Sequence, residues 1–176
     1  MTSLDALKFP IGKWKRPEDF DLVQALQDVL TIARLPQNLD DWVESAEDGD
    51  IEKTYRPEGW TGAQVINHLA DSHMNAFVRS KLTMTEDKPS ILPYLEAAWA
   101  ELPDGKTVDV SASLSLINGL HARWVLFFES LQPEDWKRQY YHPESKADFA
   151  LYEVASLYAW HSEHHYNHLL LIHNPS

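Results

Sequence analysis

The chain has 176 residues, 44% of them hydrophobic and 11% aromatic, with 15 basic and 27 acidic residues and a net charge of −12. This composition predicts one folded domain over residues 1–176 and excludes a largely disordered chain. The acidic balance disfavours nucleic acid and anionic membranes as partners, and no run of roughly 18 apolar residues is present to cross a bilayer.

The spacing of apolar residues predicts four long helices, of which the first two lie in the N-terminal half. The first runs from about residue 17 to 44, opens with acidic residues that suit the helix dipole, and is broken or kinked at Pro36. The second begins with Thr61 as the N-cap, in a capping box with Gln64, and continues to about Met84.

A long proline-containing connection follows, with a short helix expected near residues 95–101. A connection of this length is often functional or packs over a site. The third helix is expected over residues 110–131 and the fourth over 149–173, started by Asp148. Strand signals are weak, because alternating runs are short and isolated. The pattern predicts an all-α protein, a four-helix bundle with long crossover connections.

The fourth predicted helix, in the stretch LYAWHSEHHYNHLLLIH, carries five of the nine histidines. At about 100° of rotation per residue, His161, His165 and His168 fall within its apolar stripe, whereas His164 lies at the edge. A buried imidazole without partners costs about 1–3 kcal/mol, so three on one core face indicate a shared purpose. The pair His161 and His165, four residues apart, has the spacing that lets two side chains hold one metal ion.

The alternative is that these histidines are hydrogen-bonded core residues, as a single histidine on an apolar face usually is. The metalloprotease helix His-Glu-x-x-His is absent, because Ser162 follows His161 and Glu163 lies about 200° around the helix from His161. A metal site also needs a third ligand from elsewhere, and His68, His73, His121 and His142 all remain candidates on spacing.

Three segments of the chain resemble the YfiT proteins of the DinB-like superfamily: RPEGWTGAQVINHLADSHMNAFVRSKL, PSILPYLEAAWAEL and YAWHSEHHYNHL. The early FPIGKW is similar as well, so the resemblance extends over nearly the whole chain in the same order. The resemblance implies a four-helix bundle of the DinB/YfiT type and one divalent metal ion per chain. Matched residue by residue, it implies His68, His161 and His165 as the ligands. It also implies a homodimer.

Three imidazoles leave one coordination position open, which is the pattern of catalytic rather than structural zinc. No cysteine is present, so the expected ion is zinc, with nickel as an alternative, and a cytoplasmic location is expected. Four residues are expected to line the pocket or contact the ligands: His168, Asp71, Asn75 and Arg79. Asp71 could equally be an exposed carboxylate, and Arg79 could bind an anionic substrate or pair with a carboxylate. The sequence identifies no general base.

Three functions remain open. The first is a metal-dependent hydrolase in which a bound water attacks a small-molecule substrate, the activity usually inferred for the YfiT group. The second is an S-transferase in which the same ion activates a low-molecular-weight thiol, as in other DinB-like proteins. The third is a non-catalytic metal-binding bundle, which a pocket too narrow for anything beyond water would favour.

Overall fold

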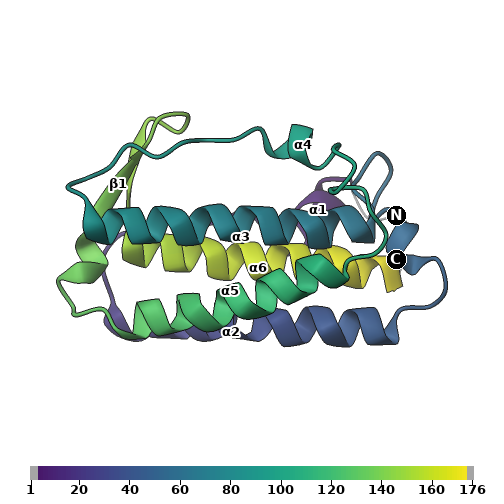
Figure 1. Cartoon of the computed structure of the whole chain (residues 1–176), viewed down its shortest axis with the longest axis horizontal. Helices are drawn as coiled ribbons and strands as arrows, with labels where there is room; N and C mark the ends of the chain where they lie inside the picture. The colour runs from purple at the N-terminus through teal and green to yellow at the C-terminus, as the bar shows by residue number, and fades with distance from the viewer. Residues whose placement is uncertain (1–3, 174–176) are drawn as a thin grey trace.

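A computed structural model describes residues 4–173. Its body consists of four long helices, α2 (Leu22–Ser45), α3 (Gly62–Thr85), α5 (Ser111–Glu129) and α6 (Leu151–His173) (Figure 1). The predicted all-α bundle is therefore confirmed, while the ends of the expected domain, residues 1–3 and 174–176, lie outside the described residues. Within residues 4–173, no helix is long and apolar enough to cross a membrane.

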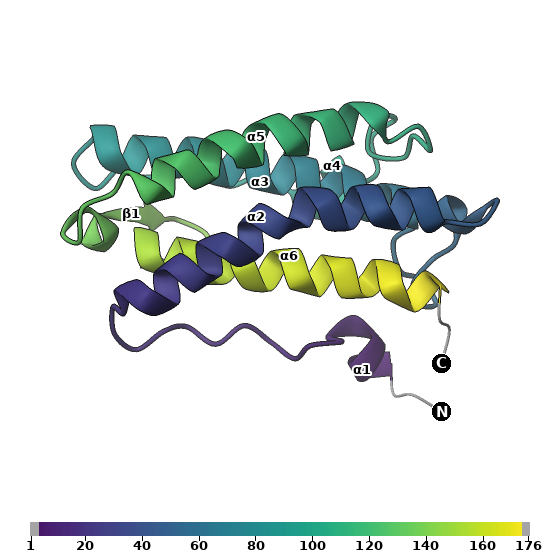
Figure 2. The ribbon, with the colours of Figure 1, turned by 90° about the horizontal axis from the view of Figure 1, so that it is seen from below.

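The helices are arranged so that neighbours in the chain are not always neighbours in space. Helices α2 and α3 each pack against both α5 and α6, which places α2 and α3 at opposite corners of the bundle. Helices α2 and α6 run in one direction and α3 and α5 in the other (Figures 1 and 2). Because α3 and α5 are parallel, residues 86–110 must return along the bundle, and this crossover contains the short helix α4 (Glu96–Trp99).

The first two long helices each begin at a residue whose side chain caps the first turn, Asp21 for α2 and Thr61 for α3. Helix α2 starts at Leu22 and not near residue 17, because the Asp21 carboxylate accepts hydrogen bonds from the backbone N–H groups of the first turn, at 2.8 Å for Val23. It continues through Pro36 and changes direction near its middle (Figure 2). The predicted capping box of α3 is confirmed, with Gln64 N 3.2 Å from Thr61 Oγ1 and Thr61 N 3.1 Å from Gln64 Oε1.

The structure contains a β-hairpin that the sequence did not predict. Strand β1 (Gln139–His142) pairs antiparallel with β2 (Ala147–Ala150), directly after the 3₁₀ helix η2 (Asp135–Lys137). The prediction that Asp148 starts the fourth helix was wrong, because Asp148 lies in β2 and α6 begins at Leu151. The hairpin also holds the crossover: Tyr141 N donates to Pro89 O at 2.9 Å, and its carbonyl accepts from Ile91 N at 3.0 Å.

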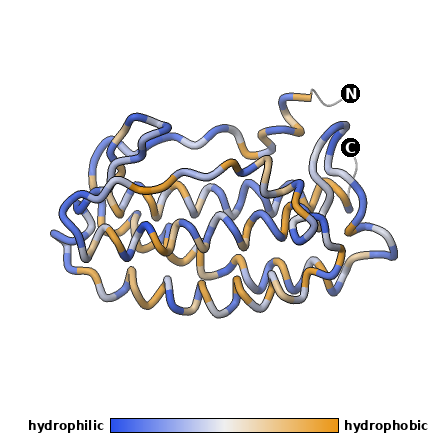
Figure 3. The backbone as a smooth tube through the Cα atoms, turned by 45° about the horizontal axis from the view of Figure 1, so that its top comes forward, coloured by the Kyte–Doolittle hydropathy of each residue, from blue (hydrophilic) through white to orange (hydrophobic). Residues whose placement is uncertain are grey.

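The core consists of two hydrophobic clusters along the bundle axis. One contains Ile32 of α2, Ala76 of α3, Trp124 of α5 and Ala159 of α6, and the other contains residues from the opposite halves of the same helices. Hydrophobic residues recur at short intervals along every long helix, with hydrophilic residues between them (Figure 3). His73 of α3 and four histidines of α6 lie between the two clusters in sequence position: His161, His164, His165 and His168. His68 and His121 lie at the edges of the clusters and contact this group through His161 and His73. These side chains form a polar layer in the middle of the bundle.

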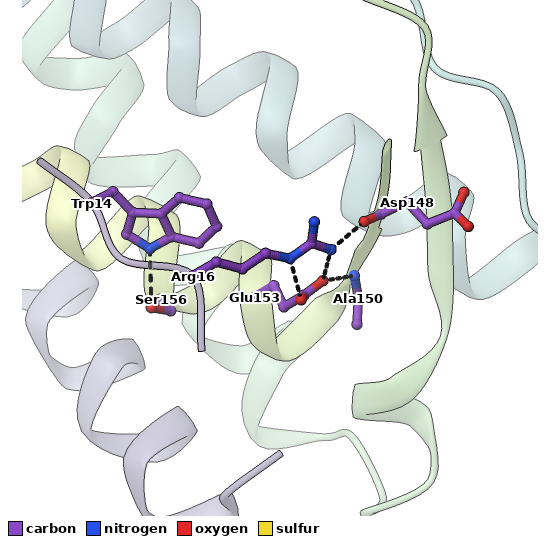
Figure 4. Close-up of polar contacts among 6 residues, drawn as sticks. All are labelled: Trp14, Arg16, Asp148, Ala150, Glu153 and Ser156. Carbon is purple, nitrogen blue, oxygen red and sulfur yellow. Dashed lines mark hydrogen bonds and ion pairs between the residues drawn. The ribbon is translucent and has the colours of Figure 1, made fainter. Parts of the chain in front are cut away.

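An N-terminal arm precedes the bundle. After the short helix α1 (Leu4–Lys8), residues 9–20 run along the outside of α6 (Figure 2). Trp14 Nε1 donates to Ser156 Oγ at 3.2 Å and Trp160 Nε1 donates to the carbonyl of Gly12 at 3.1 Å. Figure 4 shows Arg16 of the arm reaching Glu153 of α6 beside the indole of Trp14. The arm thereby covers one side of the helix that carries most of the histidines.

Candidate metal centre

Three histidines from two helices converge in the middle of the bundle. His68 lies two turns into α3, and His161 and His165 lie one turn apart on α6, which packs against α3. One ring nitrogen of each lies within 4.8 Å of the others, and Nε2 of His68 is 3.3 Å from Nε2 of His161. His68 and His165 are buried, while His161 is half-buried. The structure thus brings together the three residues that the resemblance implied.

These imidazoles are neutral at ordinary pH. Burial, followed by the nearby His164, lowers the pKa of His68 to about 4. Burial and then the neighbouring histidines hold the pKa values of His161 and His165 well below the ordinary value. A neutral imidazole keeps one nitrogen lone pair, which a protonated one lacks. The three rings therefore present lone pairs and no positive charge to one another.

The donor set fits a divalent metal ion. Neutral imidazole nitrogens suit zinc and nickel, and three protein ligands leave a coordination position for a reactant. Within residues 4–173, the group of donors consists of these three histidines and includes no carboxylate that would complete a closed structural site. The Nε2 atoms of His68 and His161 face one another at 3.3 Å, as two ligands of one ion would.

A second group of histidines adjoins the first. His164, His165 and His168 also have ring nitrogens within 4.8 Å of one another, so His165 belongs to both groups. Nδ1 of His168 is 3.4 Å from Nδ1 of His165, and its Nε2 is 3.2 Å from the carbonyl oxygen of Lys8. His168 therefore contacts His165 of the first group. Burial lowers its pKa to about 3.

A cavity of about 410 Å³ opens onto the histidines. Its polar floor contains His68, His161, His164, His165 and His168. Its walls are aromatic and charged, and come from the arm, the segment before α3, helix α4 and α6: Lys8, Phe9, Tyr55, Arg56, Glu58, Trp60, Glu96 and Trp160. Trp60 lies against His68 with ring centroids 4.7 Å apart, and Tyr55 stacks on His168 at 3.9 Å. The sequence does not predict these walls, because most of their residues come from the arm and the segment before α3, whose packing no periodicity reveals.

The other three expected pocket residues lie elsewhere. Asp71 lines a separate hollow beside Asp104, and burial raises its pKa. Nδ2 of Asn75 donates to the carbonyl of Asp71 on its own helix at 2.9 Å. Arg79 is buried and its Nη2 donates to the carbonyl of Leu92 at 3.0 Å, so it fastens the crossover to α3. None of the three contacts the histidine triad among the interactions described.

Two further histidines that spacing left open have buried positions beside the triad. Nε2 of His73 is 3.0 Å from Nδ1 of His161, and Nδ1 of His73 is 2.9 Å from Nε2 of His121. His142, by contrast, ends β1 and bonds locally with Ser145. Spacing alone does not identify His73 and His121 as neighbours of the triad, because it does not determine which faces of α3, α5 and α6 meet.

Comparison with known proteins places this arrangement in a family. The model of the DinB superfamily matches residues 31–169. YfiT of Bacillus subtilis, named as a proposed metal-dependent hydrolase, is 43% identical over 169 residues, covering 96% of this chain and 94% of that protein. A protein of Geobacillus kaustophilus with the same description is 38% identical over 165 residues, covering 94% and 93%.

The fold of this chain is also similar to a solved structure. The structure of YfiT from Bacillus subtilis, described as a probable metal-dependent hydrolase with an unusual four-helix bundle topology, superposes with a TM-score of 0.93 at 40% identity. The match covers 97% of both chains. With a family model over most of its length and relatives of this similarity, the chain belongs to the DinB superfamily and to its YfiT-type proteins.

Proposed function

We propose that this chain is a metal-dependent hydrolase of a small-molecule substrate, with one divalent ion held by His68, His161 and His165 of a single domain, residues 1–176. The observation that carries the proposal is the convergence of three neutral imidazoles from α3 and α6 on the floor of a cavity. Zinc is the proposed ion and nickel the alternative. A homodimer and a cytoplasmic location belong to the same proposal and rest on the resemblance and on the absence of cysteine.

The chemistry that such an ion supplies is Lewis-acid activation of a water molecule for attack on a carbonyl or a similar centre. The remaining tasks fall to side chains of the cavity. Trp60 and Tyr55 cover His68 and His168 and exclude bulk water from that side of the floor. His164 also lines the cavity, and its buried Nδ1 has no hydrogen-bond partner among the described residues.

The size of the cavity supports a substrate rather than a site that holds only an ion. Pockets for small molecules commonly measure 300–1,000 Å³, and a volume of about 410 Å³ lies within that range. The non-catalytic alternative would be favoured by a pocket that admits little more than water. We therefore favour an enzyme over a metal-binding scaffold.

The thiol S-transferase is the second candidate, and the charges of the cavity wall support it. Lys8 and Arg56 line the cavity, and such cations can pair with a carboxylate carried by a small thiol. Glu58 and Glu96 lie in the same wall, so the preference for an anionic reactant is limited. The two enzymatic functions differ in whether water or thiol is the nucleophile.

The experiment that separates them uses zinc-loaded protein in two assays. One follows the hydrolysis of a panel of simple esters and amides without thiol, and the other follows product from a chlorinated dinitrobenzene with several low-molecular-weight thiols. We expect hydrolysis without thiol, lost in His161→Ala and retained in His142→Ala, which removes a histidine outside the site. Product that forms only with thiol would replace the hydrolase by the transferase, and inactivity in both assays would contradict catalysis.

A further inference from the structure

A line of buried imidazoles extends from the triad to the far side of the bundle. Nδ1 of His161 is 3.0 Å from Nε2 of His73, Nδ1 of His73 is 2.9 Å from Nε2 of His121, and Nδ1 of His121 is 2.8 Å from the carbonyl oxygen of Ile32. His73 is 0% exposed and His121 is 1% exposed. We call His121, His73 and His161 the histidine relay. It joins α5, α3 and α6 and ends on the backbone of α2.

The end of the relay depends on a proline. In a regular helix the carbonyl of Ile32 would accept the backbone N–H of residue 36, but Pro36 has no N–H. The carbonyl of Ile32, a residue buried in the core, would otherwise lack a hydrogen-bond partner. The ring of His121 supplies a donor at this position. His121 of α5 thus replaces the backbone hydrogen bond that Pro36 removes from α2.

The carbonyl sets the direction of every hydrogen bond in the relay. A carbonyl oxygen only accepts, so Nδ1 of His121 must carry a proton, and in the neutral ring Nε2 is then an acceptor. That acceptor requires a proton on Nδ1 of His73, which leaves Nε2 of His73 as an acceptor. This second acceptor requires the proton of His161 to sit on Nδ1. The lone pair of His161 is consequently on Nε2, the atom 3.3 Å from Nε2 of His68.

The rings of the relay are neutral, as this argument requires. Burial is the main cause that lowers the pKa of His121 to about 4, against a smaller opposing effect of its bond to Ile32. Burial, together with His121, His161 and His68, holds the pKa of His73 well below its ordinary value. A neutral imidazole has one donor and one acceptor, and the state of one nitrogen therefore fixes the state of the other.

We propose that His73 and His121 are positioning residues of the metal centre: through the relay, the carbonyl of Ile32 holds the proton of His161 on Nδ1 and keeps Nε2 available as a ligand. The proposal deepens the proposed function, since it rests on His161 as a metal ligand. With the opposite tautomer, a proton would occupy Nε2 of His161 in the space that the ion requires. Residues that hold the second nitrogen of a ligating histidine typically change metal affinity about 10–100-fold when they are replaced.

His165 has a shorter arrangement of the same kind. The carbonyl of Lys8 is an acceptor, so the ring of His168 donates from Nε2 and accepts at Nδ1, which faces Nδ1 of His165 at 3.4 Å. This again leaves Nε2 of His165 as the nitrogen with the lone pair. Two ligands on one helix therefore have their protons directed away from the triad by separate backbone carbonyls. The two lines are independent, because one ends on the carbonyl of Ile32 and the other on that of Lys8.

The direct test reads the tautomers in the metal-free wild-type protein labelled with ¹⁵N in the histidine rings. Two-bond ¹⁵N–¹H correlation spectra above pH 7 identify which nitrogen of each ring carries the proton. We expect His121, His73 and His161 all to be protonated at Nδ1. A proton on Nε2 of His161 in this form would overturn the assignment. Because the measurement uses no metal, its outcome is separate from that of the proposed hydrolase activity.

The second test measures zinc affinity by competition with a chelator. His121→Phe removes the acceptor that holds the proton of His73, and we expect zinc binding to weaken about 10–100-fold. His121→Gln can still donate to Ile32 and accept from His73, so its affinity should stay within about threefold of wild type, as should that of His142→Gln, a remote control. Equal affinity of His121→Phe and wild type would refute the role of the relay. A wild-type protein that binds no zinc would instead refute the metal site itself.

Discussion

Glu153, near the start of α6, connects three separate parts of the chain. It is 5% exposed, and its two oxygens lie 2.6 Å from Nε and 2.8 Å from Nη2 of Arg16. The second oxygen also accepts the backbone N–H of Ala150 at 2.7 Å, and Arg16 reaches the carbonyl of Asp148 (Figure 4). A single buried carboxylate thereby holds the arm and the end of the hairpin against the first turn of α6. The arm in turn supplies Lys8 and Phe9 to the cavity wall.

Replacing Glu153 with glutamine should loosen this junction. Glu153→Gln removes the charge that the bidentate Arg16 requires, and we expect a loss of about 1–3 kcal/mol in the free energy of unfolding, since hydrogen bonds to charged groups have this size. Urea denaturation at pH 7 measures the change. Glu163→Gln, which removes the same charge from the same helix away from this junction, should remain within about 0.5 kcal/mol of wild type. Equal destabilisation by both variants would contradict a specific role for the junction.

At the same scale, the sequence predicted some residues of the site and not others. His161, His165 and His168 follow from helical spacing, because one turn of α6 determines which of its rings share a face. The choice of His68 over His73 and His121 came from family resemblance, since it depends on which faces of three helices meet. Asp71, Asn75 and Arg79 lie on neighbouring turns of the helix that carries His68. Asp71 lines a separate hollow, Asn75 bonds to a carbonyl of its own helix, and Arg79 bonds to the crossover.

At the scale of elements, the four long helices and the short helix of the crossover, α4, were predictable, and the hairpin was not. Periodicity and the capping box placed α3 to within a residue, and α5 and α6 to within two residues at most ends. The hairpin was missed, because its strands have four residues each and gain stability from the crossover segment Pro89–Ile91. The start of α2 was placed too early, since acidic residues before Asp21 resemble a first turn. The hairpin thus depends on contacts between segments distant in the chain, whereas the start of α2 depends on the local cap by Asp21.

The tryptophans illustrate the same limit. The contacts of each of the seven tryptophans lie within one copy of the chain, and the sequence alone does not predict them. Trp42, Trp124 and Trp136 are buried in the core, while Trp60 and Trp160 line the cavity. Trp14 bonds to Ser156 of α6, and Trp99 packs on Tyr94 in the crossover. The number of large aromatic residues reflects the walls of the cavity as much as the core.

At the scale of the whole molecule, the polar layer makes stability depend on pH. Seven histidines have pKa values lowered chiefly by burial, to about 4 for several of them: His68, His73, His121, His161, His164, His165 and His168. In the unfolded chain a histidine has a pKa of about 6.5. As the pH falls below about 6.5, the unfolded chain therefore binds protons that the folded metal-free protein does not, and the free energy of unfolding decreases.

The expected decrease is large because many groups contribute. Each histidine of this kind adds a slope of up to about 1.4 kcal/mol per pH unit between the unfolded and folded pKa values. We expect metal-free protein to be several kcal/mol less stable at pH 5.5 than at pH 7.5, as urea denaturation at both pH values would measure. A midpoint unchanged between these pH values would show that the histidines are not held neutral in the fold.

The central claim is that one divalent ion is bound by His68, His161 and His165. The most direct measurement is the metal content of tag-free protein after incubation with zinc and removal of the excess, determined by elemental analysis alongside protein concentration. The account predicts about one ion per chain for wild type and for His142→Ala, and near zero for His161→Ala. A full ion retained by His161→Ala, or none bound by wild type, would contradict it.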